Sequence, residues 1–208
     1  MYKAFLFDMD GTLVDTFQNI HESFNAALRL NGKRELSEDE FSRELFGKSV
    51  DETLPRLVGG LSDPEKEKIR EDFKEVWIEG IPQIKIFKNI TETLQSLKDR
   101  NCKLAVVSTS PRGVIEKTLA EVGILHFFDA IVGEEDAEFK KPHKEPVEKA
   151  LSVLGVKPEE AIFIGDTEYD IIAGRAAGCH TVLKLNGRND VAKEADPDEV
   201  IFDLSELL

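Results

Sequence analysis

The chain has 208 residues and a net charge of −14, because 41 acidic residues outnumber 27 basic ones. Apolar residues make up 41% of the chain and charged residues 33%, a composition typical of a folded globular protein and too apolar for disorder. The acidic balance disfavours nucleic acid and membrane partners, which need a basic surface. Two cysteines are too few for a disulfide framework or a cysteine-rich metal site. With neither a leader nor a membrane-spanning run in the sequence, we expect a cytoplasmic protein.

An apolar run over residues 2–7 is followed directly by the acidic residue Asp8 and predicts a buried strand that reaches the surface there. Asp8 and Asp10 lie two residues apart, so both carboxylates point to the same side of an extended chain. Gly11 then permits a sharp turn or the close approach of a ligand. Two carboxylates this close favour a bound cation, a shared proton, or both. The alternative is a plain acidic turn, since Asp and Gly are turn formers.

Residues 16–80 have helical periodicity and no strand pattern. A first helix is predicted over residues 16–30. Three capping boxes follow it, each consisting of an N-cap serine and a glutamate three residues later. These boxes are Ser37 with Glu40, Ser49 with Glu52, and Ser62 with Glu65. We therefore expect four helices in an inserted domain over residues 15–80, with residues 1–14 and 81–208 forming the core.

From about Ile86 onward, strands alternate with helices. The expected strands are 103–107, 130–132, 161–164, 181–185 and 200–202. The expected helices are 89–100, with Asn89 as its cap, 112–122, 143–154 and 168–177. This alternation predicts an α/β fold with a doubly wound, Rossmann-like parallel sheet. Because ligands bind at the carboxyl ends of parallel strands, we expect one rim to carry the polar residues that follow the strands. These are Asp8, Asp10, Ser108, Lys141 and Asp166.

Four motifs in this order and spacing resemble those of the haloacid dehalogenase superfamily. They are Asp8-Met9-Asp10-Gly11-Thr12, Ser108, Lys140-Lys141-Pro142 and Gly165-Asp166-Thr167-Glu168-Tyr169-Asp170. The resemblance covers nearly the whole chain and places the helical insertion where that family has its cap domain. It is closest to phosphoglycolate-phosphatase-like members of the branch that also includes β-phosphoglucomutase. The dehalogenase branch lacks an acid at the position of Asp10.

The resemblance implies a Mg²⁺-dependent phosphatase that hydrolyses a small phosphomonoester, phosphoglycolate-like or a sugar phosphate, through an aspartyl-phosphate. Asp8 would attack phosphorus, and Asp10 would serve as general acid and then as general base. The Mg²⁺ ligands would be the Asp8 carboxylate, the Asp10 backbone carbonyl and Asp166. Asp170, four residues further on, would orient these ligands from behind them.

Three more core residues are candidates for binding the phosphoryl group: Ser108, Thr109 and Lys141. Ser108 could instead cap the helix that follows it. Either Lys140 or Lys141 could be plain surface charge, and Lys141 is preferred because it immediately precedes Pro142, as in the family motif. Many relatives have a second proline where this chain has Lys144, so the shape of that loop is open.

Substrate selection is expected to come from the inserted cap domain, because the core motifs hold only the phosphate. Lys48, on a loop between two predicted helices, could bind a second anionic group such as a carboxylate, or it could be a solvated lysine. Thr16 is a further substrate-binding candidate. The β-phosphoglucomutase branch has a histidine where this chain has Ile20, with His21 one position away, which disfavours a mutase.

The expected partner is therefore a small-molecule phosphate ester, with no nucleic acid or membrane partner, and the protein is expected to be a monomer or weak dimer. The alternatives are a sugar phosphomutase or an inorganic pyrophosphatase that uses the same site. A catalytically silent binding module is a third alternative. Such a module would be expected to have lost one of Asp8, Asp10 and Asp166, and all three are present.

Overall fold

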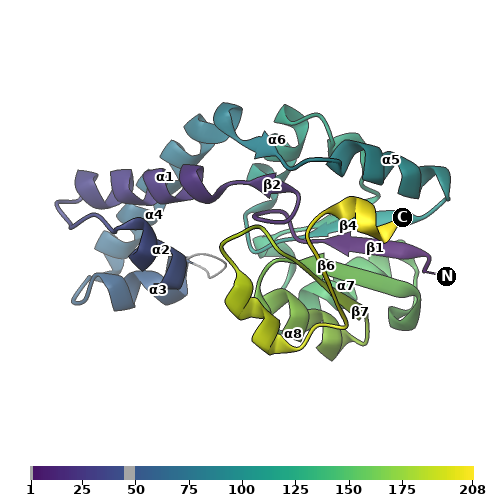
Figure 1. The fold of residues 1–208 in the computed structure, drawn as a ribbon. Coiled ribbons are helices and arrows are strands. Elements are labelled where there is room, and N and C mark those ends of the chain that lie inside the picture. The colour runs from purple at the N-terminus through teal and green to yellow at the C-terminus, as the bar shows by residue number, and fades with distance from the viewer. Residues whose placement is uncertain (1, 45–49) are drawn as a thin grey trace. The chain divides into compact units, whose positions relative to one another are not determined.

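A computed structural model of the chain describes residues 2–44 and 50–208 and divides into two compact units (Figure 1). The first, which we call the sheet unit, comprises Met1–Asp15 and Lys85–Leu208. The second, the helical unit, comprises Thr16–Ile84. Two short antiparallel strands, β2 (Val14–Asp15) and β3 (Lys85–Ile86), pair where the chain leaves the sheet unit and returns to it.

The helical unit contains the four helices expected from the sequence, and its described residues form no strand. They are α1 (Phe17–Leu30), α2 (Glu38–Glu44), α3 (Val50–Leu57) and α4 (Asp63–Gly80). Helices α1 and α4 pack against each other through aromatic side chains: the rings of Phe24 and Phe73 lie 5.9 Å apart, edge to face. The capping boxes at Ser37 and Ser62 form, while the one at Ser49 lies outside the described residues.

The sheet unit is built on six parallel strands in the order β5-β4-β1-β6-β7-β8. Their bounds are β1 (Ala4–Phe7), β4 (Lys103–Val107), β5 (Ala130–Val132), β6 (Ala161–Gly165), β7 (His180–Lys184) and β8 (Glu199–Ile201). The order reverses at β1, whose neighbours β4 and β6 lead away in opposite directions. Ligands of open α/β sheets bind at the carboxyl end of such a switch point, which is where Asp8 lies.

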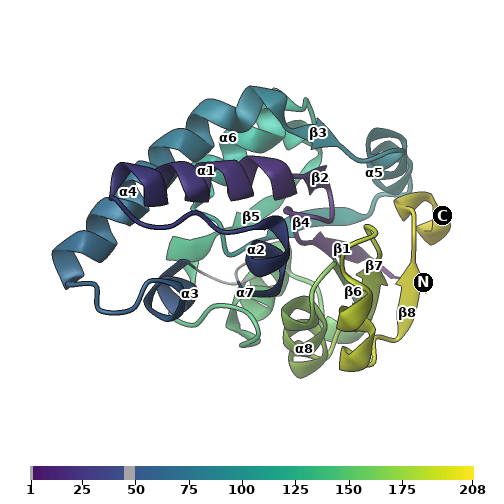
Figure 2. The same ribbon diagram turned by 60° about the vertical axis from the view of Figure 1, so that its left-hand side comes forward.

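Helices cover both faces of this sheet. Helices α7 (Glu145–Leu154) and α8 (Glu168–Ala177) pack side by side on one face, as Figure 2 also shows. Alternate strand residues point toward these two helices, among them Leu6, Ala105 and Phe163, and form a buried cluster with them. Helix α5 (Ile90–Asp99) lies on the other side of the sheet (Figure 1), and α6 (Arg112–Glu121) connects β4 to β5. The predicted doubly wound α/β fold is therefore confirmed.

Some predicted element ends are wrong by one or two residues. The α7 helix begins at Glu145 instead of His143, and β7 begins at His180 instead of Thr181. Asn89 does not cap α5 with its side chain; its backbone is left-handed, with φ 57°. Its amide Nδ2 instead donates to Asp203 Oδ2 at 3.0 Å, which ties the start of α5 to the C-terminal segment.

Short elements with little periodicity were not predicted. They are β2, β3 and the 3₁₀ helices η1 (Ile81–Gln83), η2 (Leu125–Phe127), η3 (Glu134–Asp136), η4 (Pro158–Glu160), η5 (Asp190–Ala195) and η6 (Leu204–Leu207). Among the helices that the structure describes, none combines the length and apolar character needed to cross a membrane.

Two helical glycines give a matched test of this packing. A Cβ at Gly174 in α8 would lie 2.9 Å from Thr181 Cγ2 and 3.0 Å from Phe163 Cδ1, whereas a Cβ at Gly113 in α6 would meet nothing within 4 Å. We expect Gly174→Ala to lower the free energy of unfolding by about 1–3 kcal/mol through overpacking. Gly113→Ala should leave it unchanged or raise it by up to about 1 kcal/mol. Urea unfolding measures both, and equal effects would contradict this packing.

Candidate active site

A buried ion-paired lysine lies at the centre of the carboxyl rim of the sheet. Lys141 Nζ lies 2.6 Å from Asp8 Oδ1 and 2.6 Å from Asp170 Oδ1, and it donates to the carbonyl of Val107 at 3.0 Å. Asp8 directly follows β1, and its backbone N–H donates to the Ile164 carbonyl at 2.8 Å, which fixes it against β6. Lys141 therefore joins the ends of β1 and β4 to the start of α8.

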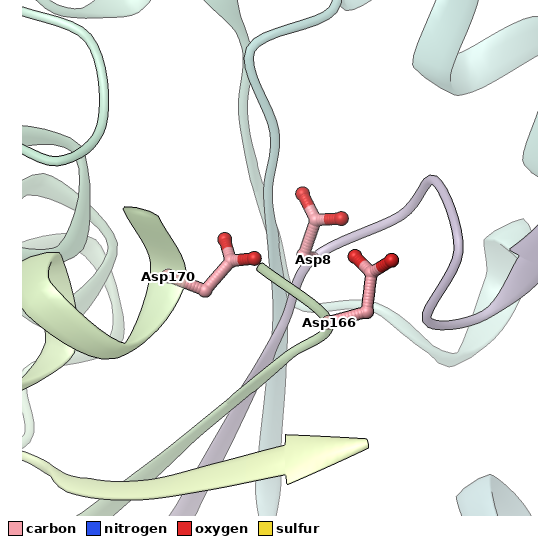
Figure 3. A group of neighbouring side chains, drawn as sticks. All are labelled: Asp8, Asp166 and Asp170. Carbon is pink, nitrogen blue, oxygen red and sulfur yellow. The ribbon is translucent and has the colours of Figure 1, made fainter. Parts of the chain in front are cut away.

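Two further carboxylates reach this centre from the end of β6 and the first turn of α8. Asp166 is fully buried and Asp170 is nearly so. Oxygens of Asp8, Asp166 and Asp170 all lie within 4.8 Å of one another, and Figure 3 shows the three side chains gathered at the strand ends. A Cβ on Gly165 would lie 2.2 Å from Asp170 Cβ, so a residue without a side chain is required there. A buried, oxygen-only donor set of this kind could bind a hard divalent cation.

The electrostatics of the cluster show an excess of negative charge. Burial raises the pKa of Asp8 to about 8; Asp170 and Asp10 add to the rise, and Lys141 opposes it. Burial, with the charges of Asp8 and Asp170, also raises the pKa of Asp166 well above its usual value. Burial alone would lower the pKa of Lys141, but Asp170 and Asp8 outweigh it and raise that pKa. The charges of Lys141 and Lys184 oppose the rise in the pKa of Asp166 without cancelling it, so carboxylates remain in excess at the cluster, a balance that an additional cation would relieve.

The second carboxylate oxygen of Asp170 accepts hydrogen bonds at the N-terminus of α8. Its Oδ2 accepts hydrogen bonds from Thr167 N at 3.0 Å and from Thr167 Oγ1 at 2.7 Å, while Oδ1 is paired with Lys141. Both oxygens therefore have protein partners. This geometry matches the orienting role expected for Asp170 more closely than that of a direct metal ligand.

Asp10 and the polar residues after β4 form the second part of the rim. Ser110 Oγ donates to Asp10 Oδ2 at 2.9 Å and so orients that carboxylate. Ser108 is buried, and its Oγ accepts from Ser110 N at 3.1 Å. It does not cap α6, whose preceding residue is Pro111, so the hydroxyl proton of Ser108 can be donated to a ligand. Thr109 lies between these two serines and is half-buried.

The two adjacent lysines are clearly different in the structure. Lys141 is 8% exposed and holds Asp8 and Asp170, whereas Lys140 forms an ion pair with Glu134 at the edge of the site. Lys144, which replaces the second proline of many relatives, pairs with Glu148 on α7. The loop that has Lys144 in place of the second proline therefore still positions Lys141 between Asp8 and Asp170.

Several polar contacts at the rim were not predicted from the sequence. Ser110 holds Asp10, Thr12 Oγ1 lies 3.5 Å from Asp166 Oδ1, and Asn186 Nδ2 donates to Asp166 Oδ2 at 2.8 Å. Ser110 was within reach of sequence reasoning, because it belongs to the Ser-Thr-Ser run after β4. Asn186 was not, because an Asn-Gly pair after a strand predicts only a turn.

Two further substrate-binding candidates, Lys48 and Thr16, come from the helical insertion predicted from the sequence. Lys48 lies outside the described residues. Thr16 belongs to the helical unit, where it precedes α1 and its carbonyl accepts from Ile20 N at 2.9 Å. His21 is buried in the same unit, and its Nε2 lies 2.9 Å from the Leu36 carbonyl, so it helps to hold the α1–α2 connection.

Comparison with known proteins identifies the class. Residues 5–184 match the family model described as haloacid dehalogenase-like hydrolase. The chain belongs to the haloacid dehalogenase-like hydrolase family, as its motifs and its α/β fold with a helical insertion suggested.

Its curated relatives include two named activities. The chain is 30% identical to phosphoglycolate phosphatase of Haemophilus influenzae over 217 residues, covering 100% of this chain and 97% of the relative. It is 36% identical to phosphoglycolate phosphatase of Aquifex aeolicus, covering 89% and 85%. It is 33% identical to pyrophosphatase PpaX of Halalkalibacterium halodurans, covering 98% and 94%.

A solved structure of a predicted phosphoglycolate phosphatase from Haemophilus somnus has the same fold. It superposes with a TM-score of 0.89 at 27% identity and covers 99% of this chain and 96% of its own. Together with the curated relatives, this similarity supports the assignment of the chain as a hydrolase of the phosphatase type.

The raised pKa of Asp8 predicts a pH dependence for the metal-free protein. Because the folded pKa of about 8 exceeds the ordinary value of 3.8, the folded state binds more protons than the unfolded state between them. The stability that Asp8 contributes is fully present below pH 3.8, the ordinary pKa, and is lost as the pH rises through the folded-state pKa of about 8. In EDTA we expect the melting temperature to fall between about pH 5 and about pH 8, and to fall less in Asp8→Asn.

A matched control for this pH series is Asp190→Asn, because Asp190 is an exposed carboxylate that pairs with Lys193. This variant should have the pH profile of the wild type. A wild-type melting temperature that rises over the interval, or an Asp8→Asn profile as steep as that of the wild type, would contradict the account of the buried charges.

Proposed function

We propose that the chain is a Mg²⁺-dependent phosphatase that hydrolyses a small phosphomonoester through an aspartyl-phosphate on Asp8. The observation that carries this proposal is the buried contact of Lys141 with Asp8 and Asp170, with Asp166 beside them at the switch point of the sheet. A phosphate ester dianion repels an anionic nucleophile, so the site must supply positive charge beside Asp8. Lys141 supplies part of that charge.

In the first half-reaction, the carboxylate of Asp8 attacks phosphorus and the bond from phosphorus to the leaving oxygen breaks. Asp10 gives its proton to that oxygen, which leaves as an alcohol. Ser110 holds the Asp10 carboxyl in place for this transfer. Ser108 and Thr109, which follow β4 on the same rim, are the donors we assign to the phosphoryl oxygens.

In the second half-reaction, a water molecule attacks phosphorus while Asp10 accepts its proton. The bond between phosphorus and the Asp8 oxygen breaks, which releases inorganic phosphate and restores the Asp8 carboxylate. Lys141 remains paired with Asp8 and Asp170 in the resting site and stabilises the carboxylate that returns. Asp10 then holds the proton needed for the next turnover.

The residues that would hold Mg²⁺ are the carboxylates of Asp8 and Asp166 and the backbone carbonyl of Asp10. The ion would neutralise charge on the transferring phosphoryl group and position it in line with Asp8. The fit rests on the oxygen-only donor set and on the excess of buried carboxylates over cations at the cluster. Lys48, proposed from the sequence, remains the candidate for a contact with the substrate's second anionic group.

A second candidate function is hydrolysis of inorganic pyrophosphate by the same residues. Its support is the similarity to PpaX pyrophosphatases, of which the example from Halalkalibacterium halodurans aligns with 98% of this chain. In that reaction the leaving group would be phosphate in place of an alcohol, with Asp8 and Asp10 in unchanged roles.

Substitution of the two aspartates tests the mechanism. Asp8→Asn should leave the chain folded and abolish turnover, because a neutral amide does not attack phosphorus. Asp10→Asn should slow kcat by about 10²–10⁴-fold, the usual contribution of a general acid. Asp99→Asn, at the exposed end of α5, is the control and should retain full activity. Substantial activity of Asp8→Asn toward an aryl phosphate would exclude Asp8 as the nucleophile.

A substrate series with and without metal tests the reaction class. Phosphate release from phosphoglycolate, a sugar phosphate, an aryl phosphate and pyrophosphate is measured in Mg²⁺ and in EDTA. We expect activity only with Mg²⁺, and the highest kcat/KM with a phosphomonoester. Highest activity on pyrophosphate would favour the second candidate, and full activity in EDTA would contradict the metal requirement.

A further inference from the structure

An asparagine on the loop after β7 contacts the cluster of buried carboxylates at the strand ends. The two hydrogens of the Asn186 Nδ2 group are directed at Asp166 Oδ2, 2.8 Å away, and at the Gly11 carbonyl, 3.2 Å away. Its Oδ1 accepts from Arg188 N at 3.1 Å, which fixes the side-chain amide in this orientation. Asn186 thereby connects the end of β6 with the turn that follows Asp8 and Asp10.

A second asparagine fixes the position of the first. Asn189 is 8% exposed, and its Oδ1 accepts from Asn186 N at 3.0 Å. Its Nδ2 donates to the backbone carbonyls of Asp166 at 2.7 Å and Lys184 at 2.9 Å. Asn189 therefore holds the backbone of Asp166 and the loop, while Asn186 holds the Asp166 carboxylate.

The turn after Asp10 is shaped to admit this contact. Gly11 has φ +80°, a conformation that favours glycine, and a Cβ there would lie 2.2 Å from Asp166 Oδ2 and 3.0 Å from Asn186 Nδ2. Within residues 2–44 and 50–208, the hydrogen-bond partner of the other oxygen of Asp166, Oδ1, is Thr12 Oγ1 at the long distance of 3.5 Å. Asn186 thus occupies one oxygen of Asp166 and leaves the other for a ligand.

We propose that Asn186 is a positioning residue for Asp166, holding this carboxylate in the orientation that receives the divalent cation; the inference rests on the proposed metal site. A neutral amide suits this role, because it donates hydrogen bonds to the carboxylate and adds no positive charge that would repel the cation. Partners behind a metal ligand fix its orientation, and their loss typically weakens metal binding by about 10–100-fold.

The test is direct titration of the full chain with Mn²⁺, followed by electron paramagnetic resonance of the free ion. Asn186→Ala should weaken Mn²⁺ binding by about tenfold or more. Asp190→Ala, which removes an exposed side chain at the start of η5, should change it less than about twofold. At saturating Mg²⁺, Asn186→Ala should retain most of kcat with a nearly unchanged KM, while its half-activating Mg²⁺ concentration rises in parallel with the Mn²⁺ constant. Asn186→Ser, which keeps a hydroxyl donor, should recover part of the lost affinity.

The outcomes separate the two proposals. If the wild type binds no Mn²⁺, the proposed metal site fails, whatever Asn186 does. If the wild type binds Mn²⁺ and Asn186→Ala binds it equally well, the positioning role is overturned and the metal site stands. A lower melting temperature of Asn186→Ala with unchanged Mn²⁺ affinity likewise overturns it, because it shows a structural role alone. If Asn186→Ala fails to fold, the Mn²⁺ affinities of Asn186→Ser and Asn186→Leu are compared with that of the wild type in its place. An affinity of Asn186→Leu equal to that of the wild type would then overturn the positioning role.

Discussion

The site depends on one buried ammonium that holds two carboxylates. Lys141 lies at 2.6 Å from both Asp8 and Asp170 with its side chain 5% exposed, so all three charges are largely removed from water. Breaking such a buried pair leaves an uncompensated charge, which costs more than an exposed ion pair would. With Asp166 added, the cluster has more negative than positive charge. The arrangement is therefore suited to a metal ion and to an anionic phosphate bound with it.

The parallel sheet is what brings these groups together. Asp8, Ser108 and Asp166 each follow a strand, and β1 lies between β4 and β6, so their carboxyl ends meet at one place. Lys141 comes from farther along the chain, and its contact with the Val107 carbonyl fixes it to the end of β4. Close approach of the segments requires the absence of side chains at Gly11 and Gly165. The chemistry thus follows from the strand order and from two glycines.

Much of the fold could be predicted from the sequence, because its signals are local. Helix α8 and strands β4 and β5 have the predicted bounds, since apolar periodicity and glycine stops mark them. Asp8 and Asp166 could be placed on one rim because each directly follows a strand, and Lys141 was assigned to it through the lysine motif that precedes Pro142. The contacts of Asn186 and Asn189 with the site could not be predicted, because they join the loop to the distant residues Gly11 and Asp166 and an asparagine in a loop has no distinctive pattern. The prediction that the Asn89 side chain caps α5 was wrong for the same reason: its hydrogen-bond partner, Asp203, is 114 residues away.

The most direct test of the account is to find the residue that carries the phosphoryl group during turnover. The enzyme is mixed with a phosphomonoester and Mg²⁺, quenched in cold acid within one turnover, digested, and its peptides are examined by mass spectrometry. The account predicts a phosphoryl adduct on Asp8 that is absent from Asp8→Asn and from samples in EDTA. An adduct on a different residue, or rapid phosphate release without any adduct at the earliest times, would contradict it.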